Sequence, residues 1–101
     1  MTYFMYTTMG ESIDEPDASH MRRILSELQN ADDEHSDVSL NHESGWSLTV
    51  YPDKGVLWEN VEDADVPPRE AVPASWDDVV ALLLEISQGN FAAVESIDWT
   101  S

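Results

Sequence analysis

Residues 37–61 of the chain, DVSLNHESGWSLTVYPDKGVLWENV, decide the fold. Apolar and polar residues alternate there in three short runs, which is the pattern of β-strands that bury one face. The segment ESG at residues 43–45 separates the first two runs, and YPDKG at residues 51–55 has the proline, aspartate and glycine of a tight turn. The sequence therefore predicts a meander of three antiparallel strands.

Upstream of the meander, residues 17–30 have the periodicity of an amphipathic helix. Apolar side chains recur there at spacings of three, four and seven residues, at Met21, Ile24, Leu25 and Leu28. Pro16 and Asp17 stand at its start, where proline fits the first turn and aspartate can accept a backbone N–H. Residues 31–36, ADDEHS, are expected to form an acidic loop.

A second amphipathic helix is predicted downstream of the meander. Ser75 stands three residues before Asp78, the short form of a capping box. The apolar stripe that follows consists of Val79, Val80, Leu82, Leu83 and Ile86. Gly89 suits the left-handed residue that ends a helix, and Asn90 is placed to cap a last short turn.

The remaining segments are assigned by composition. Residues 2–8 mix aromatics with threonines and predict a strand with both faces partly covered. Residues 10–16 are polar and predict a turn. Residues 62–73 hold three of the five prolines and predict a covering loop. Residues 97–99 either close as a strand or dock as an extended tail.

The resulting element order, β-α-β-β-β-α, gives the fold class. We predict an α+β fold, with a mainly antiparallel sheet of about four strands and two amphipathic helices packed on one face. A chain of 101 residues of which 42% are hydrophobic fits a single globular domain over residues 1–101.

The charge balance restricts the kinds of partner. Four Lys and Arg stand against 21 Asp and Glu, so the formal net charge is −17. Such a charge repels phosphate backbones and anionic lipids, and we expect neither direct nucleic-acid binding nor membrane binding. The first residues carry no basic and apolar leader pattern, so a cytoplasmic location is expected.

No motif in the chain carries recognisable catalytic or metal chemistry. There is no cysteine, and His20, His35 and His42 do not occur at metal-ligand spacings with the nearby acids. A glycine-rich phosphate loop and a G-x-S-x-G elbow are also missing. We therefore expect no enzyme activity, no catalytic residue, no metal site and no cofactor.

The acidic residues are the strongest functional signal. They cluster in residues 32–37 and 59–65, where we expect negative patches beside the sheet that speed the approach of a basic protein. Tryptophan is enriched at interface hot spots, although on an alternating strand it is more often a core residue. The expected partner-binding residues are Asp32, Asp33, Glu34, Asp37, Glu43, Trp46, Trp58, Glu59, Glu62 and Asp63.

Two stretches carry a resemblance to a known class of protein. They are DEHSDVSLNHESGWSLTVYPDKGVLWEN at residues 33–60 and SWDDVVALLLEISQGNFAAVESIDW at residues 75–99. Together they resemble the small, acidic, cytosolic immunity proteins of bacterial polymorphic-toxin and contact-inhibition systems, in style rather than through a defining motif. The resemblance implies a compact α+β domain that blocks a cognate toxin stoichiometrically, without catalysis, and implies no particular binding residue.

Three functional hypotheses follow. The first is an immunity protein that occludes the active site or substrate groove of a toxin with a basic face. The second is a DNA-mimic inhibitor, which needs carboxylates along one face at roughly 6 to 7 Å, the spacing of phosphates. The third is a small salt-adapted ligand-binding domain. Clustering of the acids in loops favours the first.

Overall fold

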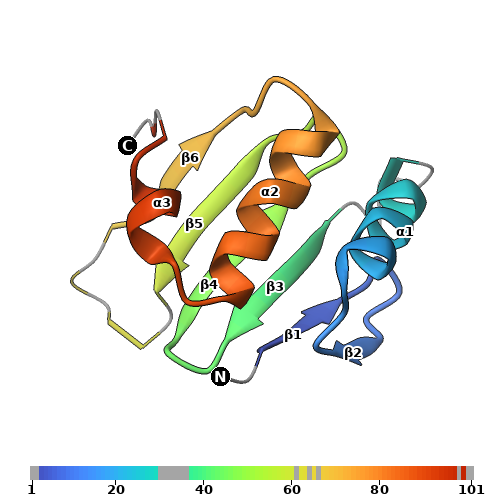
Figure 1. The fold of residues 1–101 in the computed structure, drawn as a ribbon, viewed down its shortest axis with the longest axis horizontal. Helices are drawn as coiled ribbons and strands as arrows, with labels where there is room; N and C mark the ends of the chain where they lie inside the picture. Colours follow the sequence, from blue (N-terminus) through green and yellow to red (C-terminus); the bar gives the residue numbers. More distant parts are fainter. Residues whose placement is uncertain are drawn as a thin grey trace.

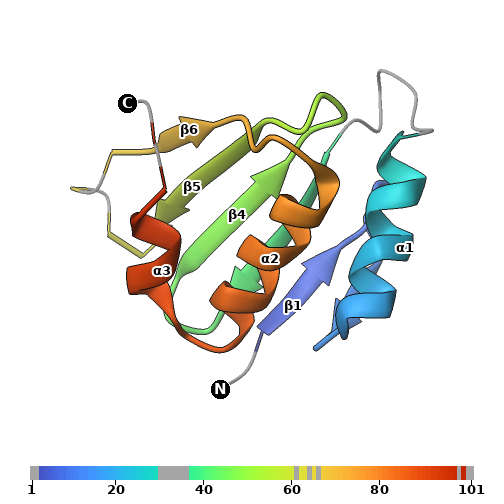
Figure 2. The same cartoon turned by 45° about the horizontal axis from the view of Figure 1, so that its top comes forward.

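A computed structural model describes residues 3–29, 37–60, 62, 63, 65, 67–97 and 99 of the chain. Six strands form one antiparallel sheet in the order β2-β1-β3-β4-β5-β6. The strands are β1 (Tyr3–Tyr6), β2 (Ser12–Asp14), β3 (Val38–His42), β4 (Trp46–Val50), β5 (Val56–Asn60) and β6 (Arg69–Ala71). The helices α1 (Ala18–Gln29), α2 (Trp76–Ser87) and α3 (Phe91–Glu95) all lie on one face of the sheet (Figures 1 and 2).

The predicted α+β class and the antiparallel meander are confirmed. Strands β3, β4 and β5 pair in register, with Leu40 opposite Leu48 and Leu48 opposite Trp58. The β4–β5 turn closes at Tyr51, whose N–H donates to the Gly55 carbonyl at 2.9 Å. Alternation along the strands therefore sets the register, because a slip of one residue would turn every apolar side chain outward.

The prediction of about four strands and two helices is wrong in number. Strand β2 lies in the expected turn at residues 10–16 and pairs with β1, with Ile13 opposite Met5. Strand β6 lies in the expected covering loop and pairs with β5, with Arg69 opposite Trp58. Each is only three residues long and sits at a sheet edge, where backbone pairing stabilises a strand too short to show an alternating pattern.

Both long helices begin as their capping residues predict. The backbone N–H of His20 donates to Oδ1 of Asp17 at 2.9 Å, and that of Asp78 donates to the hydroxyl of Ser75 at 3.2 Å. Helix α2 ends at Ser87 with Gln88 as its C-cap, and Gly89 follows with φ +75°, a conformation that glycine adopts without strain. Asn90 precedes α3 as expected, but its amide donates to Glu85 and caps nothing.

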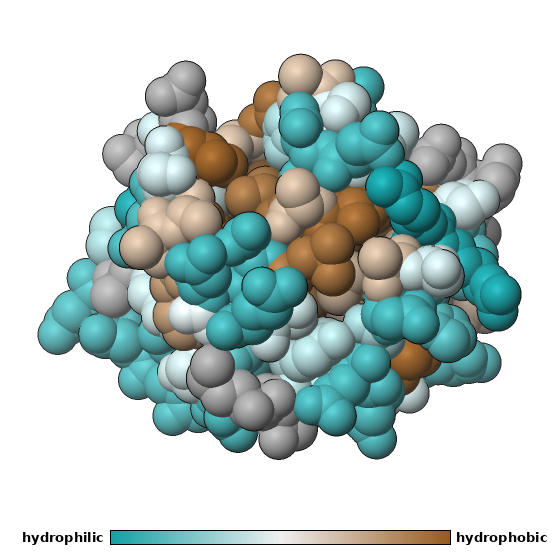
Figure 3. Space-filling model, in the orientation of Figure 1, coloured by the Kyte–Doolittle hydropathy of each residue, from teal (hydrophilic) through white to brown (hydrophobic). Residues whose placement is uncertain are grey.

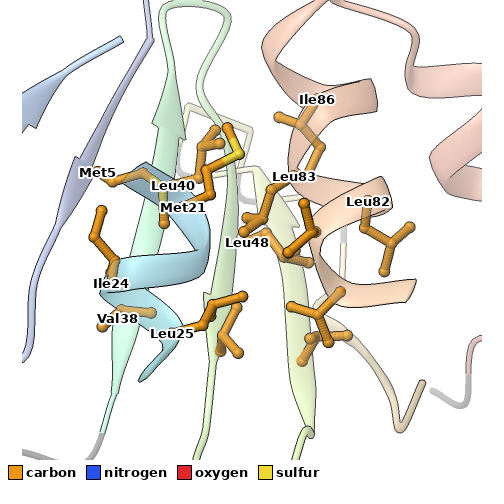
Figure 4. Close-up of a cluster of buried hydrophobic side chains, with 14 of the residues drawn as sticks. Met5, Met21, Ile24, Leu25, Val38, Leu40, Leu48, Leu82, Leu83 and Ile86 are labelled. Atoms are coloured by element: carbon orange, nitrogen blue, oxygen red, sulfur yellow. The ribbon is translucent and has the colours of Figure 1, made fainter. Parts of the chain in front are cut away.

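The apolar stripes of the helices meet the inner face of the sheet in one core (Figure 4). All the side chains of the two predicted stripes are buried: Met21, Ile24, Leu25 and Leu28 from α1, with Val79, Val80, Leu82, Leu83 and Ile86 from α2. They pack on Met5, Leu40 and Leu48 of the sheet. Among the described residues, no helix is both long and apolar enough to span a bilayer.

Two exposed ion pairs join elements that are distant in the sequence. Arg22 of α1 bonds Asp77 of α2 at 2.7 Å, and Arg69 of β6 bonds Glu95 of α3 at 2.7 Å. Exposed pairs contribute little to stability, at most about 1 kcal/mol each. Their larger effect is on surface charge, since two of the four Lys and Arg residues are already matched within the chain.

Candidate functional site

The sheet face opposite the helices, here called the outer face, is not covered by any helix of the described chain (Figure 2). Strand pairing places its side chains in two rows. One row runs across Asp14, Phe4, Asn41, Ser47 and Glu59, and the other across Ser12, Tyr6, Ser39, Thr49, Leu57 and Glu70. Most of these side chains keep some solvent exposure, so the outer face is available to a partner.

Small polar side chains occupy the centre of the outer face. The amide of Asn41 donates to the Ser39 hydroxyl at 3.1 Å, and the Ser47 hydroxyl donates to Oδ1 of Asn41 at 3.2 Å. Beside them on β1, the rings of Phe4 and Tyr6 meet edge to face with centroids 5.2 Å apart. A flat polar centre beside an aromatic pair suits contact with another protein, because tyrosine is enriched at interfaces.

Carboxylates gather around Tyr51 on the other side of the outer face. Burial raises the pKa of Tyr51 above its ordinary value of 10.0, and the negative charges of Asp37, Glu70 and Glu59 raise that pKa further. We call Asp37, Glu59 and Glu70 the Tyr51-side acids. Three carboxylates that act on one phenol concentrate negative charge at this place.

A hollow of about 200 Å³ lies beside Tyr51, between the β4–β5 turn and β6. Its lining includes Tyr51, Asp53 and Glu70. Oδ1 of Asp53 accepts the backbone N–H of Gly55 at 2.8 Å, which fixes this carboxylate at the turn. Carboxylates bind guanidinium and ammonium groups by charge-assisted hydrogen bonds, and an aromatic ring attracts the same cations to its face. The hollow can therefore accept an arginine or lysine side chain from a partner.

The other predicted acids lie at the opposite end of the sheet. Glu43 is in the β3–β4 turn, six residues from Asp37 along an extended strand, a separation of roughly 20 Å. Gly45 in that turn has φ +95°, and a Cβ atom there would collide with Glu62. Glu43, Glu62 and Asp63 thus form a second group, the hairpin-end acids, all of them exposed. The predicted acidic set is divided between two places.

The remaining predicted acids, Asp32, Asp33 and Glu34, lie outside the described residues, as does His35. Each of the other two histidines has a local hydrogen-bond partner. His20 bonds Asp17 at the start of α1, and Nδ1 of buried His42 accepts the Ser44 backbone N–H at 3.1 Å. Within the described part of the chain, no group of three or more His, Cys, Asp or Glu side chains is arranged to hold a metal ion.

The two predicted tryptophans differ in exposure. Trp58 has none of its surface exposed, because Trp46 stacks on it and Phe91 and Trp99 pack against it. Trp58 is therefore a core residue, which corrects its place in the predicted binding set. Trp46 keeps partial exposure at the start of β4, near the hairpin-end acids.

Four outer-face residues were missed by the sequence argument: Phe4, Tyr6, Tyr51 and Glu70. Side chains alternate between the two faces of a strand, so the pattern in residues 2–8 could have placed Phe4 and Tyr6 on the other face from Met5, away from the helices. Glu70 had no such signal, because β6 was not predicted.

Comparison of the chain with known protein families, characterised proteins and solved structures finds no match.

Proposed function

We propose that the protein is an inhibitor of the immunity type, which binds a bacterial toxin with a basic face and blocks its active site or substrate groove. The observation that carries the proposal is the hollow beside Tyr51, where Asp53 and Glu70 line a space that fits a cationic side chain. The inhibitor needs no chemistry of its own, since occupancy of the toxin's site is sufficient.

The charge of the whole chain supports the same proposal. A net charge of −17 at physiological ionic strength steers a basic partner toward the protein and raises the association rate. On the outer face, the Tyr51-side acids would pair with cations of the partner, and the exposed ring of Tyr6 on the same face would supply apolar contact.

The DNA-mimic alternative is less well supported by the same face. Asp14 and Glu59 share one row, but the uncharged residues Phe4, Asn41 and Ser47 separate them. Four strand spacings amount to about 19 Å, about three times the spacing of phosphates that a mimic must reproduce.

The test is co-expression with the product of a neighbouring open reading frame that arrests growth when expressed alone. We expect the protein to restore growth and to form a complex of fixed stoichiometry in solution, measured by light scattering. Failure of both would contradict the proposal. An enzymatic turnover of the toxin, seen as protection at far less than one equivalent, would contradict it as well.

The interface is tested by charge reversal. The pair Glu59→Lys and Glu70→Lys should slow association and flatten its salt dependence, whereas Glu27→Lys, on the exposed side of α1, should do neither. Reversal of Asp32, Asp33 and Glu34 to lysine measures the contribution of these three acids. If only this triple variant affects association, the outer face is not the interface.

A further inference from the structure

A groove lies on the helical side of the molecule, between α2, α3 and the β6–α2 connection. Its volume is about 370 Å³, within the range of small-molecule and side-chain pockets of roughly 300 to 1,000 Å³. The lining is mostly small and apolar: Ala71, Val72, Pro73, Ala81, Leu82 and Ala93. In the space-filling view, apolar residues gather between α2 and α3 in a hollow with hydrophilic residues around it (Figure 3).

The apolar surface of this groove is accessible to solvent. Val72 at its edge has 71% of its surface exposed, the highest value among the large apolar side chains of the described chain. Ala81 is also exposed on α2, although it is next to the core residue Leu82. The small side chains at positions 71, 81 and 93 leave the space that makes the groove concave.

Two carboxylates border the apolar lining on the same side of α2. Asp78 and Glu85 are seven residues apart, with Ala81 and Leu82 between them. Residues at this spacing lie on one helix face, separated by about 10.5 Å along the axis. Oε2 of Glu85 accepts a hydrogen bond from the Asn90 amide, which is neutral and leaves the charge of Glu85 in place. The cation Arg69 is paired with Glu95.

We propose that this groove binds a basic peptide segment of another protein, in which an aliphatic residue has an arginine or lysine two positions before it and another two positions after it. In an extended segment these three side chains point to the same side, and the two cations are about 13 Å apart, close to the roughly 10.5 Å between Asp78 and Glu85. The aliphatic side chain would contact the apolar lining, while the long flanking side chains reach the two carboxylates.

The charge of the chain argues against a second copy as the occupant. Each copy carries −17, and the chain has only four Lys and Arg residues, two of which are already in ion pairs. The groove is lined in part by α2 and α3, which lie on the face of the sheet opposite the outer face (Figure 2). It adjoins the hollow beside Tyr51, with which it shares Ala71 and Val72. The inference goes beyond the proposed function, and variants of Asp78, Ala81 and Glu85, which do not line the hollow, test it separately.

The probe is the synthetic peptide Gly-Ser-Arg-Ser-Leu-Ser-Arg-Ser-Gly, titrated into the isotope-labelled full chain and followed by amide chemical shifts. We expect saturable binding at micromolar to millimolar peptide, with shift changes concentrated at residues 78–85, 93 and 97, which line the groove and not the hollow beside Tyr51. Peptides with Glu in place of both Arg, or Ser in place of Leu, should bind much more weakly.

The variants separate shape from charge. Ala81→Phe fills the groove and should weaken binding by about tenfold or more, whereas Ala92→Phe, on an exposed position of α3 outside the groove, should not. Asp78→Asn and Glu85→Gln should each weaken binding by about two- to fivefold, as expected for rim charges. The matched control Glu27→Gln, on the exposed side of α1 and outside both the groove and the hollow, should leave peptide binding unchanged.

Several outcomes would overturn the inference. They are an absence of saturable binding at millimolar peptide, equal binding of the Glu-flanked peptide, and equal weakening by Ala81→Phe and Ala92→Phe. Self-association of the wild type that Ala81→Phe abolishes would assign the groove to a second copy instead. Unchanged amide spectra outside the substituted residue verify that each variant is folded.

Discussion

Trp46 and Trp58 lie face to face across the β4–β5 pair, with ring centroids 4.4 Å apart and ring planes within 5° of parallel. They are diagonal neighbours, since Trp46 is opposite Asn60 and Trp58 is opposite Leu48. The partly exposed ring of Trp46 thereby covers the buried ring of Trp58. This stack joins the surface near the hairpin-end acids to the core.

The stack should contribute to stability beyond the area that it buries. We expect a double-mutant cycle of Trp46→Ala and Trp58→Leu to give a coupling free energy of about 0.5 to 1.5 kcal/mol. Urea denaturation of the four proteins measures it. Strictly additive effects of the two substitutions would mean that the rings do not interact in solution.

Leu83 tests the packing of α2 on the sheet. Leu83 is fully buried, and Leu83→Ala should lower the free energy of unfolding by about 2 to 5 kcal/mol because a cavity remains. The neighbour Leu84 is only partly buried, so Leu84→Ala should cost less. A cost for Leu83→Ala below about 1 kcal/mol would remove α2 from the core.

Tyr51 reports the local potential of the outer face. The combined variant Asp37→Asn, Glu59→Gln and Glu70→Gln should lower the pKa of Tyr51 toward 10.0, although burial will keep part of the shift. The pKa of Tyr51 is measured from tyrosinate absorbance as a function of pH, in a Tyr3→Phe, Tyr6→Phe background where Tyr51 is the remaining tyrosine. Because the pKa is raised on folding, the associated stability is present below the unfolded value near 10.0 and is lost as pH rises through the folded value. An unchanged titration would place these acids too far from the phenol.

Asp17 gives the opposite pH dependence at the start of α1. The backbone N–H of His20 holds the pKa of the Asp17 carboxyl below 3.8. Its stabilising effect is therefore present above that value and is lost as pH falls through the lowered pKa. Asp17→Ala should be less stable than the wild type at neutral pH, with a difference that narrows in acid. Asp17→Asn, which keeps a capping oxygen without a charge, should lose little at neutral pH.

Salt should stabilise the fold by screening self-repulsion. Between 0.1 M and 1 M potassium chloride the Debye length falls from about 10 Å to about 3 Å, so the thermal midpoint should rise. A thermal midpoint that does not change with salt concentration would mean that the 21 acids are spaced widely enough not to repel one another. A chain that folds only in molar salt would instead favour the salt-adapted hypothesis.

Local patterns in the sequence were sufficient for the long elements. The alternation in residues 37–61 predicted β3, β4 and β5, and the stripes from Met21 to Leu28 and from Val79 to Ile86 predicted α1 and α2. These elements bury a periodic apolar face, and periodicity is a property of neighbouring residues. The caps at Asp17 and Ser75 act over three residues and were predictable for the same reason.

Tertiary structure alone decided the short edge strands and the grouping of the site residues. β2 and β6 exist because the edges of β1 and β5 offer unpaired backbone groups, which no local pattern records. Asp37 and Glu43 are close in sequence, yet an extended strand holds them at opposite ends of the sheet. Tyr51 and Glu70 are distant in sequence, yet they line one hollow because β6 pairs back onto β5. Trp46 and Trp58 look alike in their strand patterns, and Phe91 of α3 packs against both rings. Trp58 is in addition stacked with Trp99, so its complete burial was decided by which neighbours the fold supplied.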